Sequence, residues 1–377
     1  MNIAFFFTYG YSLKIWEDTG TLYRELKILE VLSKKYNFKF TLFTYGDLDD
    51  LNVQLNKKVF TVIPIYTIVK KSKFNLINLF STLILPFRIK RKLKDIDLIH
   101  QHQLQGSWVT IIIKYIYKIP LVIRTGYDVY TFSKKENKNK IVIYLYKALT
   151  YFALSRSNLY TVTSVADYEF LKKTFKTAFK NVQIRPNYVD LNSFKPFSER
   201  LQRKVLTVGR LEKQKNYELL ISEFSKTENK YELDIVGKGS LEDYLKEISK
   251  KNNGSVNFLG NFENKELTNI YTNYKYFIST STFEGNPKTI LEAMSSGCIV
   301  IASAINNHLE LIEDGKTGFL FNLEDPNIFE IISNLEKNKE KSEEVAKNAI
   351  EHVIKVNSLD GLAFNTSEDY LEILNSR

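Results

Sequence analysis

Short apolar segments alternate with helical patterns along the whole chain, and this alternation occurs twice. It predicts parallel sheets covered by helices, and therefore two doubly wound α/β domains. Ligands of such sheets bind beyond the carboxyl ends of the strands, so two facing domains would form an interdomain cleft. The expected strands are Ile3–Phe7, Phe40–Thr44, Leu98–His100, Leu121–Arg124 and Leu159–Thr163 in the first half, and Val205–Val208, Glu232–Val236, Asn257–Leu259, Tyr276–Ser279 and Ile299–Ala302 in the second. Helices are expected over Leu22–Lys34 and Ile141–Leu154, and from about Tyr217, Leu241, Lys265 and Pro287.

The length of the chain also favours two domains, because 377 residues exceed the size at which single hydrophobic cores stop growing. The boundary is expected at Arg185–Asp190, where Pro186 and a following polar stretch interrupt regular structure. We predict an N-terminal domain over 1–186 and a C-terminal domain over 187–360. A C-terminal helix over 361–377 could pack back on the N-terminal domain.

The composition is that of a folded protein, since hydrophobic residues make up 44% of the chain and aromatic residues 14%. The one cysteine, Cys298, excludes an internal disulfide and indicates a reducing compartment; its apolar neighbours indicate a core residue. The first residues lack a basic start and are typical of a strand, so we expect a cytoplasmic protein. No apolar run has the length of a membrane span, since Lys114 and Lys118 interrupt Ile111–Val122.

The charge of the chain is unevenly distributed. Residues 1–190 hold 30 Lys and Arg against 14 Asp and Glu, whereas residues 191–377 hold 23 against 29. The net charge of +10 therefore originates in the first half. This asymmetry suggests that the first half faces a polyanion, either a membrane surface or a nucleic acid.

Residues 70–94 combine an apolar segment with basic clusters at both ends. Such a segment can lie at a membrane interface, attracted by anionic head groups. The alternative is an ordinary core helix with a solvated basic end, and the sequence favours neither. Pro86 interrupts the pattern near its end. The apolar residues are Phe74, Leu76, Ile77, Leu79, Phe80, Leu83, Ile84 and Phe87.

The segment 283–297 places two carboxylates eight residues apart across a loop and a helix. Asn286 is expected to cap the helix, Pro287 to be its first residue, and the closing glycine to end it. Glu284 then lies in the loop and Glu292 within the helix. Amides at a helix start attract phosphate and carboxylates bind sugar hydroxyls, so the segment suits a sugar nucleotide. The alternative is that both glutamates are ordinary surface charges.

Two further turns follow expected strands of the second half. The first, Gly209–Asn216, carries Arg210 and Lys215, whose cationic groups can grip a diphosphate. Its alternative interpretation is a solvated basic loop. The second, Gly237–Gly239, is a glycine turn of a kind found in many folds.

Together, the segments 209–216 and 283–297 resemble the donor-site motifs of retaining glycosyltransferases with the GT-B fold, in particular glycosyltransferase family 4. The resemblance covers nearly the whole chain, is strongest over 205–321, and includes a hinge-like signature, Pro186–Asp190 followed by Phe194–Pro196. It implies two facing Rossmann-like domains with an interdomain cleft. The N-terminal domain would bind the acceptor and the C-terminal domain a nucleotide sugar. It also implies a reaction that needs neither a metal nor another cofactor.

The resemblance implies a role for each donor-site residue. Glu284 would contact the transferred sugar and support positive charge at its anomeric carbon, while Glu292 would hold the ribose hydroxyls. Arg210 and Lys215 would stabilise the departing nucleoside diphosphate, which removes the usual reason for a metal. Asn216 stands where many members have glycine. The donor pocket would further include Gly285, Asn286, Pro287, Gly209, Gly237, Gly239, Leu259 and, from the N-terminal domain, Gly20.

Candidate residues of the N-terminal domain follow two expected strands. His100 and His102 resemble a family motif at a strand end and are expected to line the cleft, because no third ligand for a metal is evident. The segment 124–128 resembles a second motif, in which Tyr127 stands where many members carry histidine. Tyr127 and Asp128 are expected to contact the donor sugar or the acceptor.

We therefore expect a retaining, metal-independent glycosyltransferase that moves a sugar from a nucleotide sugar to a glycan or polyprenyl-linked acceptor. Such an enzyme would serve the biosynthesis of a cell-surface polysaccharide, such as lipopolysaccharide, O-antigen or capsule. The basic first half favours an anionic acceptor at the inner face of the cell membrane. One alternative is a sugar-nucleotide epimerase or hydrolase of the same fold. The other, a basic nucleic-acid-binding protein, is disfavoured because the sequence has no recognisable RNA-binding motif.

Overall fold

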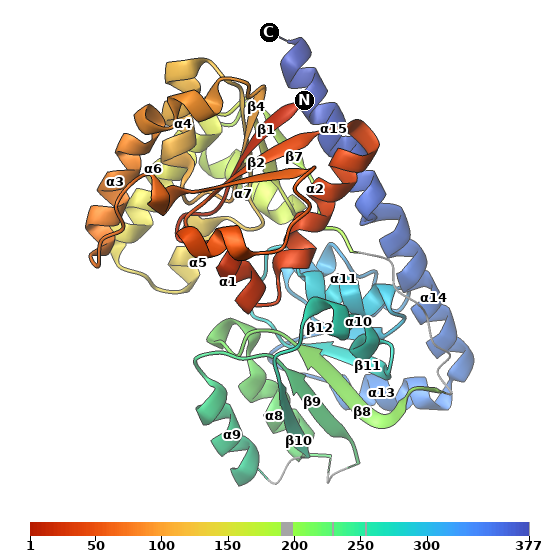
Figure 1. Cartoon of the computed structure of the whole chain (residues 1–377). Helices are drawn as coiled ribbons and strands as arrows, with labels where there is room; N and C mark the ends of the chain where they lie inside the picture. Colours follow the sequence, from red (N-terminus) through yellow and green to blue (C-terminus); the bar gives the residue numbers. More distant parts are fainter. Residues whose placement is uncertain (190–198, 228–229, 253–254, 377) are drawn as a thin grey trace. The chain divides into compact units, whose positions relative to one another are not determined.

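The computed structural model of the chain describes residues 1–189, 199–227, 230–252 and 255–376 (Figure 1). The chain divides into two compact units, one formed by Met1–Arg185 with Leu362–Arg377 and the other by Pro186–Gly361. Of the expected hinge signature, Asp190 and Phe194–Pro196 lie outside the described residues.

The first unit is built on a parallel sheet of seven described strands in the order β3-β2-β1-β4-β5-β6-β7. The strands are β1 (Asn2–Phe6), β2 (Lys39–Thr44), β3 (Phe60–Pro64), β4 (Leu98–His102), β5 (Leu121–Arg124), β6 (Leu159–Val162) and β7 (Val182–Ile184). The α-helices are α1 (Leu13–Asp18), α2 (Leu22–Tyr36), α3 (Asn75–Arg88), α4 (Ser107–Tyr117), α5 (Val129–Lys135), α6 (Lys140–Arg156), α7 (Val165–Thr174) and the greater part of α15 (Leu359–Asn375). Short 3₁₀ helices lie at Leu48–Asn52, Ile65–Thr67 and Lys90–Leu93.

The central strands of this sheet are buried on both faces, as expected of a doubly wound unit. Successive residues of β1, from Ile3 to Phe6, are each at most 3% exposed although their side chains point to opposite faces. A bidentate ion pair joins the helix α15 to the rest of the unit. The Arg185 guanidinium donates to both carboxylate oxygens of Asp369, at 2.8 and 2.6 Å.

The second unit is built on a parallel sheet of six described strands in the order β10-β9-β8-β11-β12-β13. The strands are β8 (Leu201–Val208), β9 (Glu232–Val236), β10 (Val256–Gly260), β11 (Tyr274–Ser279), β12 (Ile299–Ser303) and β13 (Phe319–Phe321). The helices are η5 (Lys213–Lys215), α8 (Tyr217–Ser225), α9 (Glu242–Lys251), α10 (Asn264–Tyr271), α11 (Lys288–Ser295), α12 (Asn306–Leu309), α13 (Ile328–Lys337) and α14 (Lys339–Val356).

Two apolar clusters cover the two faces of this second sheet. Alternate residues of β8 divide between them, since Val205 belongs to one cluster and Leu206 to the other. The first cluster includes residues of α8, α9 and α13, and the second includes residues of α10, α11 and α14. Helices therefore lie on both faces, and the carboxyl ends of the strands carry the loops that hold the candidate site.

The sequence correctly predicts the α/β class, the parallel sheets and their central strands. It misses the edge strands β3, β7 and β13. β7 and β13 have only three residues each, and β3 ends in a proline, so their sequences carry little of the strand signal. In the described part of the chain, no helix is both long and apolar enough to cross a membrane.

Candidate functional site

The candidate site of the second unit is formed by two loops at neighbouring strand ends. β8 and β11 are adjacent parallel strands, so the loops that follow them meet at the same edge of the sheet. The Thr280 hydroxyl donates to the carbonyl of Lys215 at 2.8 Å, and the Thr282 amide donates to that of Gln214 at 2.9 Å. In return, the Gln214 side chain donates to the Phe283 carbonyl at 2.7 Å. These bonds hold η5 against the segment that precedes α11.

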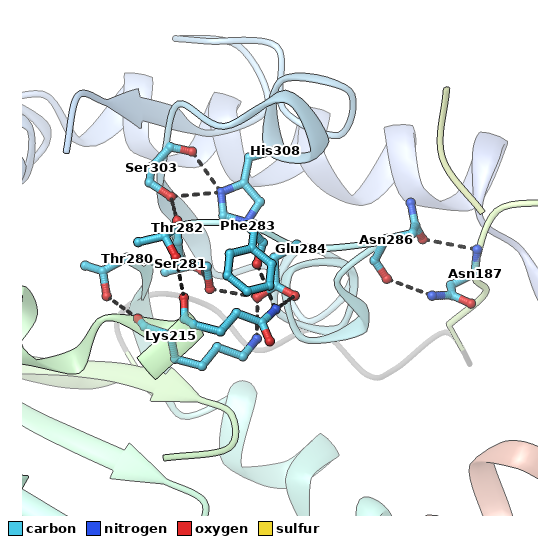
Figure 2. Close-up of polar contacts among 12 residues, drawn as sticks. Asn187, Lys215, Thr280, Ser281, Thr282, Phe283, Glu284, Asn286, Ser303 and His308 are labelled. Carbon is cyan, nitrogen blue, oxygen red and sulfur yellow. Dashed lines mark hydrogen bonds and ion pairs between the residues drawn. The ribbon is translucent and has the colours of Figure 1, made fainter. Parts of the chain in front are cut away.

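The carboxylate of Glu284 lies at the centre of these loops and is held by three polar groups (Figure 2). The Lys215 ammonium forms an ion pair with it, the Ser281 hydroxyl donates at 2.7 Å, and the Gln214 amide donates at 3.1 Å. Only 9% of the Glu284 side chain is exposed. Burial alone would raise its pKa, but the charge and hydrogen bond of Lys215, with the bond from Ser281, hold the pKa below its ordinary value. Glu284 is therefore an anion at neutral pH.

The backbone conformation of Asn216 allows η5 to be followed directly by α8. Its backbone is left-handed, with φ of 52° and ψ of 44°, and the helix α8 begins at the next residue. Asparagine tolerates this conformation better than most residues that have a side chain. Asparagine at this position is therefore compatible with the left-handed turn that leads into α8.

His308 is a member of this cluster that the sequence did not indicate. Its ring is fully buried, and Nδ1 lies 2.8 Å from the carbonyl oxygen of Ser303 at the end of β12, which therefore accepts the Nδ1 proton. The Ser303 hydroxyl donates to the Ser281 carbonyl at 2.6 Å and so links His308 to the Glu284 loop (Figure 2). Burial lowers the pKa of His308 to about 4 although the nearby Glu284 charge opposes this. The only available signal was that His308 follows a strand adjacent to β11.

Two glycines, Gly237 and Gly239, allow the loops after β8 and β9 to approach each other closely. A Cβ on Gly237 would lie 1.9 Å from the carbonyl oxygen of Gly209, and a Cβ on Gly239 would lie 2.4 Å from that of Leu211. A Cβ on Gly209 would lie 3.0 Å from Cε of Lys215. Gly237 and Gly239 thus permit the close approach of the two loops, and Gly209 leaves room for the Lys215 side chain. Whether they contact a nucleotide stays a prediction.

The start of α11 differs from the expected one by one position. Pro287 is the N-cap, Lys288 is the first helical residue, and Asn286 lies before the cap. Asn286 therefore does not cap the helix. Its side-chain oxygen accepts from the Asn187 amide at 3.1 Å, and its carbonyl accepts from the Asn187 side chain at 2.7 Å. These two contacts, drawn in Figure 2, tie the start of the second unit to the α11 loop.

The end of α11 is formed as predicted. Gly297 is left-handed, with φ of 74°, and follows the last helical residues. Its amide donates to Met294 and the amide of Cys298 donates to Ala293, which is the Schellman pattern. Cys298 is a buried core residue, as expected, and burial raises its pKa to about 12.

The remaining donor-site candidates occupy different surroundings. Glu292 is half-buried in the second turn of α11 and accepts a hydrogen bond from the Tyr271 hydroxyl at 3.0 Å. Arg210 is exposed in the loop after β8, so its guanidinium is open to a ligand from solvent. Leu259 is 39% exposed on β10. Gly285 is buried beside Glu284.

The candidates of the first unit are distributed between its core and its loops. The expectation that His100 lines a cleft is corrected, since its ring is 5% exposed, stacks on Phe5, and has Nδ1 2.6 Å from the hydroxyl of Tyr370 in α15. Burial lowers the pKa of His100 well below its ordinary value. His102 is less buried, and its Nε2 lies 3.7 Å from the Glu25 carboxylate. The two histidines lie on one face of β4 but have different partners.

Asp128 has a structural role that the sequence did not predict. It caps α5, accepting from the amide and the hydroxyl of Thr131 at 2.7 and 2.5 Å, and it is 2% exposed. Tyr127 is half-buried with its ring 4.6 Å from that of Phe132. Gly20 is left-handed, with φ of 69°, in the turn between α1 and α2. Among the described residues, no group of three or more His, Cys, Asp or Glu is placed to hold a metal ion.

The whole fold matches that of solved glycosyltransferases. A sucrose-phosphate synthase from Thermosynechococcus elongatus matches with a TM-score of 0.82 at 17% sequence identity, over 100% of both chains. Anabaena Alr3699/HepE in complex with UDP matches with a TM-score of 0.74 at 18% identity, over 99% of this chain and 100% of that chain. The two sheets thus form the GT-B fold.

Sequence comparisons also match the chain to glycosyltransferases. The family model described as "Glycosyl transferases group 1" matches residues 190–352. A UDP-Gal:alpha-D-GlcNAc-diphosphoundecaprenol alpha-1,3-galactosyltransferase of Escherichia coli is 28% identical over 297 residues, which cover 74% of this chain and 70% of the relative. The O-antigen biosynthesis glycosyltransferase WbnH of Escherichia coli is 36% identical over 151 residues, covering 38% and 42%. Together with the fold, these matches support a glycosyltransferase of the GT-B type.

Proposed function

We propose that this protein is a retaining glycosyltransferase of family 4 that transfers a sugar from a nucleotide sugar without a metal ion. The observation that carries the proposal is the Glu284 carboxylate, ionised and held by Lys215 just before α11 at the carboxyl end of β11. A fixed anion beside a fixed cation suits a reaction that develops positive charge on the sugar and negative charge on the leaving diphosphate.

In the proposed reaction, the acceptor hydroxyl attacks the anomeric carbon from the face that the diphosphate leaves. The bond from the anomeric carbon to the diphosphate oxygen breaks, the bond to the acceptor oxygen forms, and the leaving phosphate takes the hydroxyl proton. Glu284 stabilises the positive charge on the sugar, while Lys215 and the exposed Arg210 neutralise the diphosphate. Glu292, Leu259 and the glycines 209, 237, 239 and 285 line the nucleotide sugar, with Asn286 and Pro287 beside the transferred sugar. No residue forms a covalent intermediate, so the protein contributes positioning and charge.

The acceptor is proposed to be a glycan on a polyprenyl diphosphate, used at the cytoplasmic face of the membrane to build a cell-surface polysaccharide. The Escherichia coli galactosyltransferase acts, by its name, on a sugar-diphosphoundecaprenol, and WbnH by its name serves O-antigen biosynthesis. The excess of Lys and Arg in residues 1–190 suits a diphosphate-bearing acceptor. Tyr127 and His102 are the acceptor-side candidates, and Gly20, in the turn between α1 and α2, is proposed to belong to the donor pocket.

A direct assay tests the proposal. The purified protein is incubated with UDP-, GDP-, ADP- and CDP-linked sugars and a sugar-diphosphate-lipid acceptor, with EDTA present, and the configuration of the product is determined by NMR. We expect a product that keeps the donor's anomeric configuration, and a turnover about 100-fold lower for Glu284→Gln. Glu313→Gln, at an exposed glutamate of the same unit, is the matched control and should keep full activity. Inverted product, a strict metal requirement or full activity of Glu284→Gln would each refute part of the proposal, and free or isomerised sugar nucleotide would indicate a hydrolase or epimerase.

A further inference from the structure

The helix α3 exposes an apolar face to solvent. Its buried side is formed by Asn78, Thr82 and Leu85, which face the unit. The opposite side follows the helical spacing of one continuous stripe, and Arg88 in the last turn is the charged residue of α3. Its exposed residues, with the preceding Phe74 at 69%, are Leu76 at 70%, Ile77 at 52%, Phe80 at 64%, Leu83 at 40%, Ile84 at 53% and Phe87 at 63%. An ordinary core helix would be polar on this side, so these exposures count against that alternative for residues 70–94.

The apolar face continues over two neighbouring helices. α4 packs against both α3 and α6, and Figure 1 shows the three helices together. The Trp108 indole donates to the Thr82 hydroxyl at 3.0 Å, and the Lys114 ammonium donates to the Arg156 carbonyl at 2.6 Å, so polar bonds also tie α4 to each neighbour. The exposed apolar residues of α4 and α6 are Tyr115, Ile116, Ile141, Tyr144, Leu145, Tyr151 and Phe152, between 41% and 70% exposed. We call these residues and those of α3 with Phe74 the three-helix face.

The charge around the three-helix face has one sign. Residues 70–94, 107–118 and 138–156 contain eight, two and four Lys or Arg, and no Asp or Glu. Thirteen of these fourteen basic residues are exposed; seven flank α3, and Arg88 is its last residue. A surface with this composition would be attracted to anionic lipid, because each basic residue near the head groups adds to the attraction.

We propose that the three-helix face lies in the surface of a membrane that contains anionic lipid, with its apolar residues at the level of the upper acyl chains and its basic residues among the head groups. Exposed apolar surface of this extent marks an interaction site in a protein that otherwise folds compactly. A protein partner is disfavoured because lysine is depleted in protein interfaces, whereas lysine and arginine around an apolar helix face are typical of interfacial membrane binding. Six aromatic residues of the face lie on α4 and α6 or at the ends of α3, which suits the boundary between water and acyl chain. They are Tyr115, Tyr144, Tyr151, Phe152, Phe74 and Phe87.

Vesicle flotation with the full chain tests this proposal, and no sugar nucleotide or acceptor is present, so that its failure is distinguishable from failure of the proposed function. We expect binding to vesicles of phosphatidylcholine with phosphatidylglycerol, weaker binding to phosphatidylcholine alone, and release as salt increases. Replacement of Phe80 and Phe87 by serine should reduce the bound fraction about tenfold. The control replaces Leu48 and Phe364, which are 67% and 54% exposed elsewhere on the unit, and should bind as the parent does.

The basic residues are tested in the same assay. Lys90, Arg91 and Lys92 replaced by glutamine should weaken binding to the anionic vesicles and remove most of the salt dependence. Glutamine at the exposed lysines 39, 57 and 58 is the control with the same change of charge. Negligible binding to both vesicle types, or equal loss in test and control variants, would overturn the proposal. A dimer in solution that the Phe80 and Phe87 variant converts to monomer, without vesicle binding, would assign the face to self-association instead.

Discussion

Lys215 and Glu284 form an ion pair that is largely withdrawn from water, with 16% and 9% of their side chains exposed. The two residues lie 69 positions apart in the sequence and are joined only because β8 and β11 are neighbours in the sheet. A charge in such surroundings is stable while its partner is present and costly when the partner is removed. Removal of either partner alone should therefore destabilise the second unit as well as affect any chemistry that takes place there.

Lys215→Ala should lower both stability and turnover. It leaves the Glu284 carboxylate buried without its cation, and we expect a loss of about 3 kcal/mol in the free energy of unfolding. Urea denaturation measures this loss. The matched control is Lys213→Ala in the same short helix, where the lysine is exposed and its removal should change stability by less than about 0.5 kcal/mol. Equal stability of the two variants would contradict the buried pair.

Arg210→Ala should separate function from stability. The side chain is exposed, so its removal should leave the unfolding free energy within about 0.5 kcal/mol of the parent. If Arg210 binds and neutralises the leaving diphosphate, turnover with the nucleotide sugar should nevertheless fall by about 100-fold. Steady-state kinetics measure this change, and an unchanged kcat would contradict a role for Arg210 in the proposed site.

The loops of the candidate site were predictable because each carries its own local signal. Glu284, Lys215 and the glycine turn at Gly237 follow apolar strands, and a helix starts soon after each. The left-handed Asn216 also agrees with the position at which the related motif has glycine. In contrast, the one-position error at Asn286 arose because its side chain bonds to Asn187, 99 residues earlier, instead of capping the helix.

Residues whose environment depends on distant segments were not predictable. His308 is linked to the Glu284 loop by hydrogen bonds through Ser303. His100 lies in the core, where its ring contacts the hydroxyl of Tyr370, 270 residues later in the chain. The capping role of Asp128 was also not predictable, because it depends on where α5 begins in the folded chain. Local patterns specify which strand end a side chain follows, but packing decides whether that side chain faces solvent or the core.

Gly237→Ala should be among the most damaging small changes in the second unit. The new methyl group would lie 1.9 Å from the carbonyl oxygen of Gly209, which is backbone and cannot swing away. We expect a loss of about 3 kcal/mol from this overpacking. Gly260→Ala is the control, because its φ of 76° imposes a left-handed backbone but its Cβ would meet nothing within 4 Å. It should cost only about 1 kcal/mol, so similar melting temperatures of the two variants would contradict the close approach of the two loops.

The buried histidine at position 308 should make the protein sensitive to mild acid. Its pKa is about 4 in the folded chain, against an ordinary value of 6.5. Between these two pH values the ring is protonated in the unfolded chain but neutral in the folded chain. The stability that this neutral ring provides is present above pH 6.5 and is lost as the pH falls towards 4. Between pH 7 and pH 5, His308 alone should account for a loss of about 2 kcal/mol.

His308→Asn isolates this contribution, because asparagine can still donate a hydrogen bond towards the Ser303 carbonyl but does not titrate in this range. Urea denaturation of parent and variant at pH 7 and pH 5 gives the four unfolding free energies. The variant should lose about 2 kcal/mol less than the parent between the two values, while His100 and His352, whose pKa values are also lowered by burial, continue to act in both proteins. An identical pH dependence of parent and variant would mean that His308 is not held neutral beside Glu284.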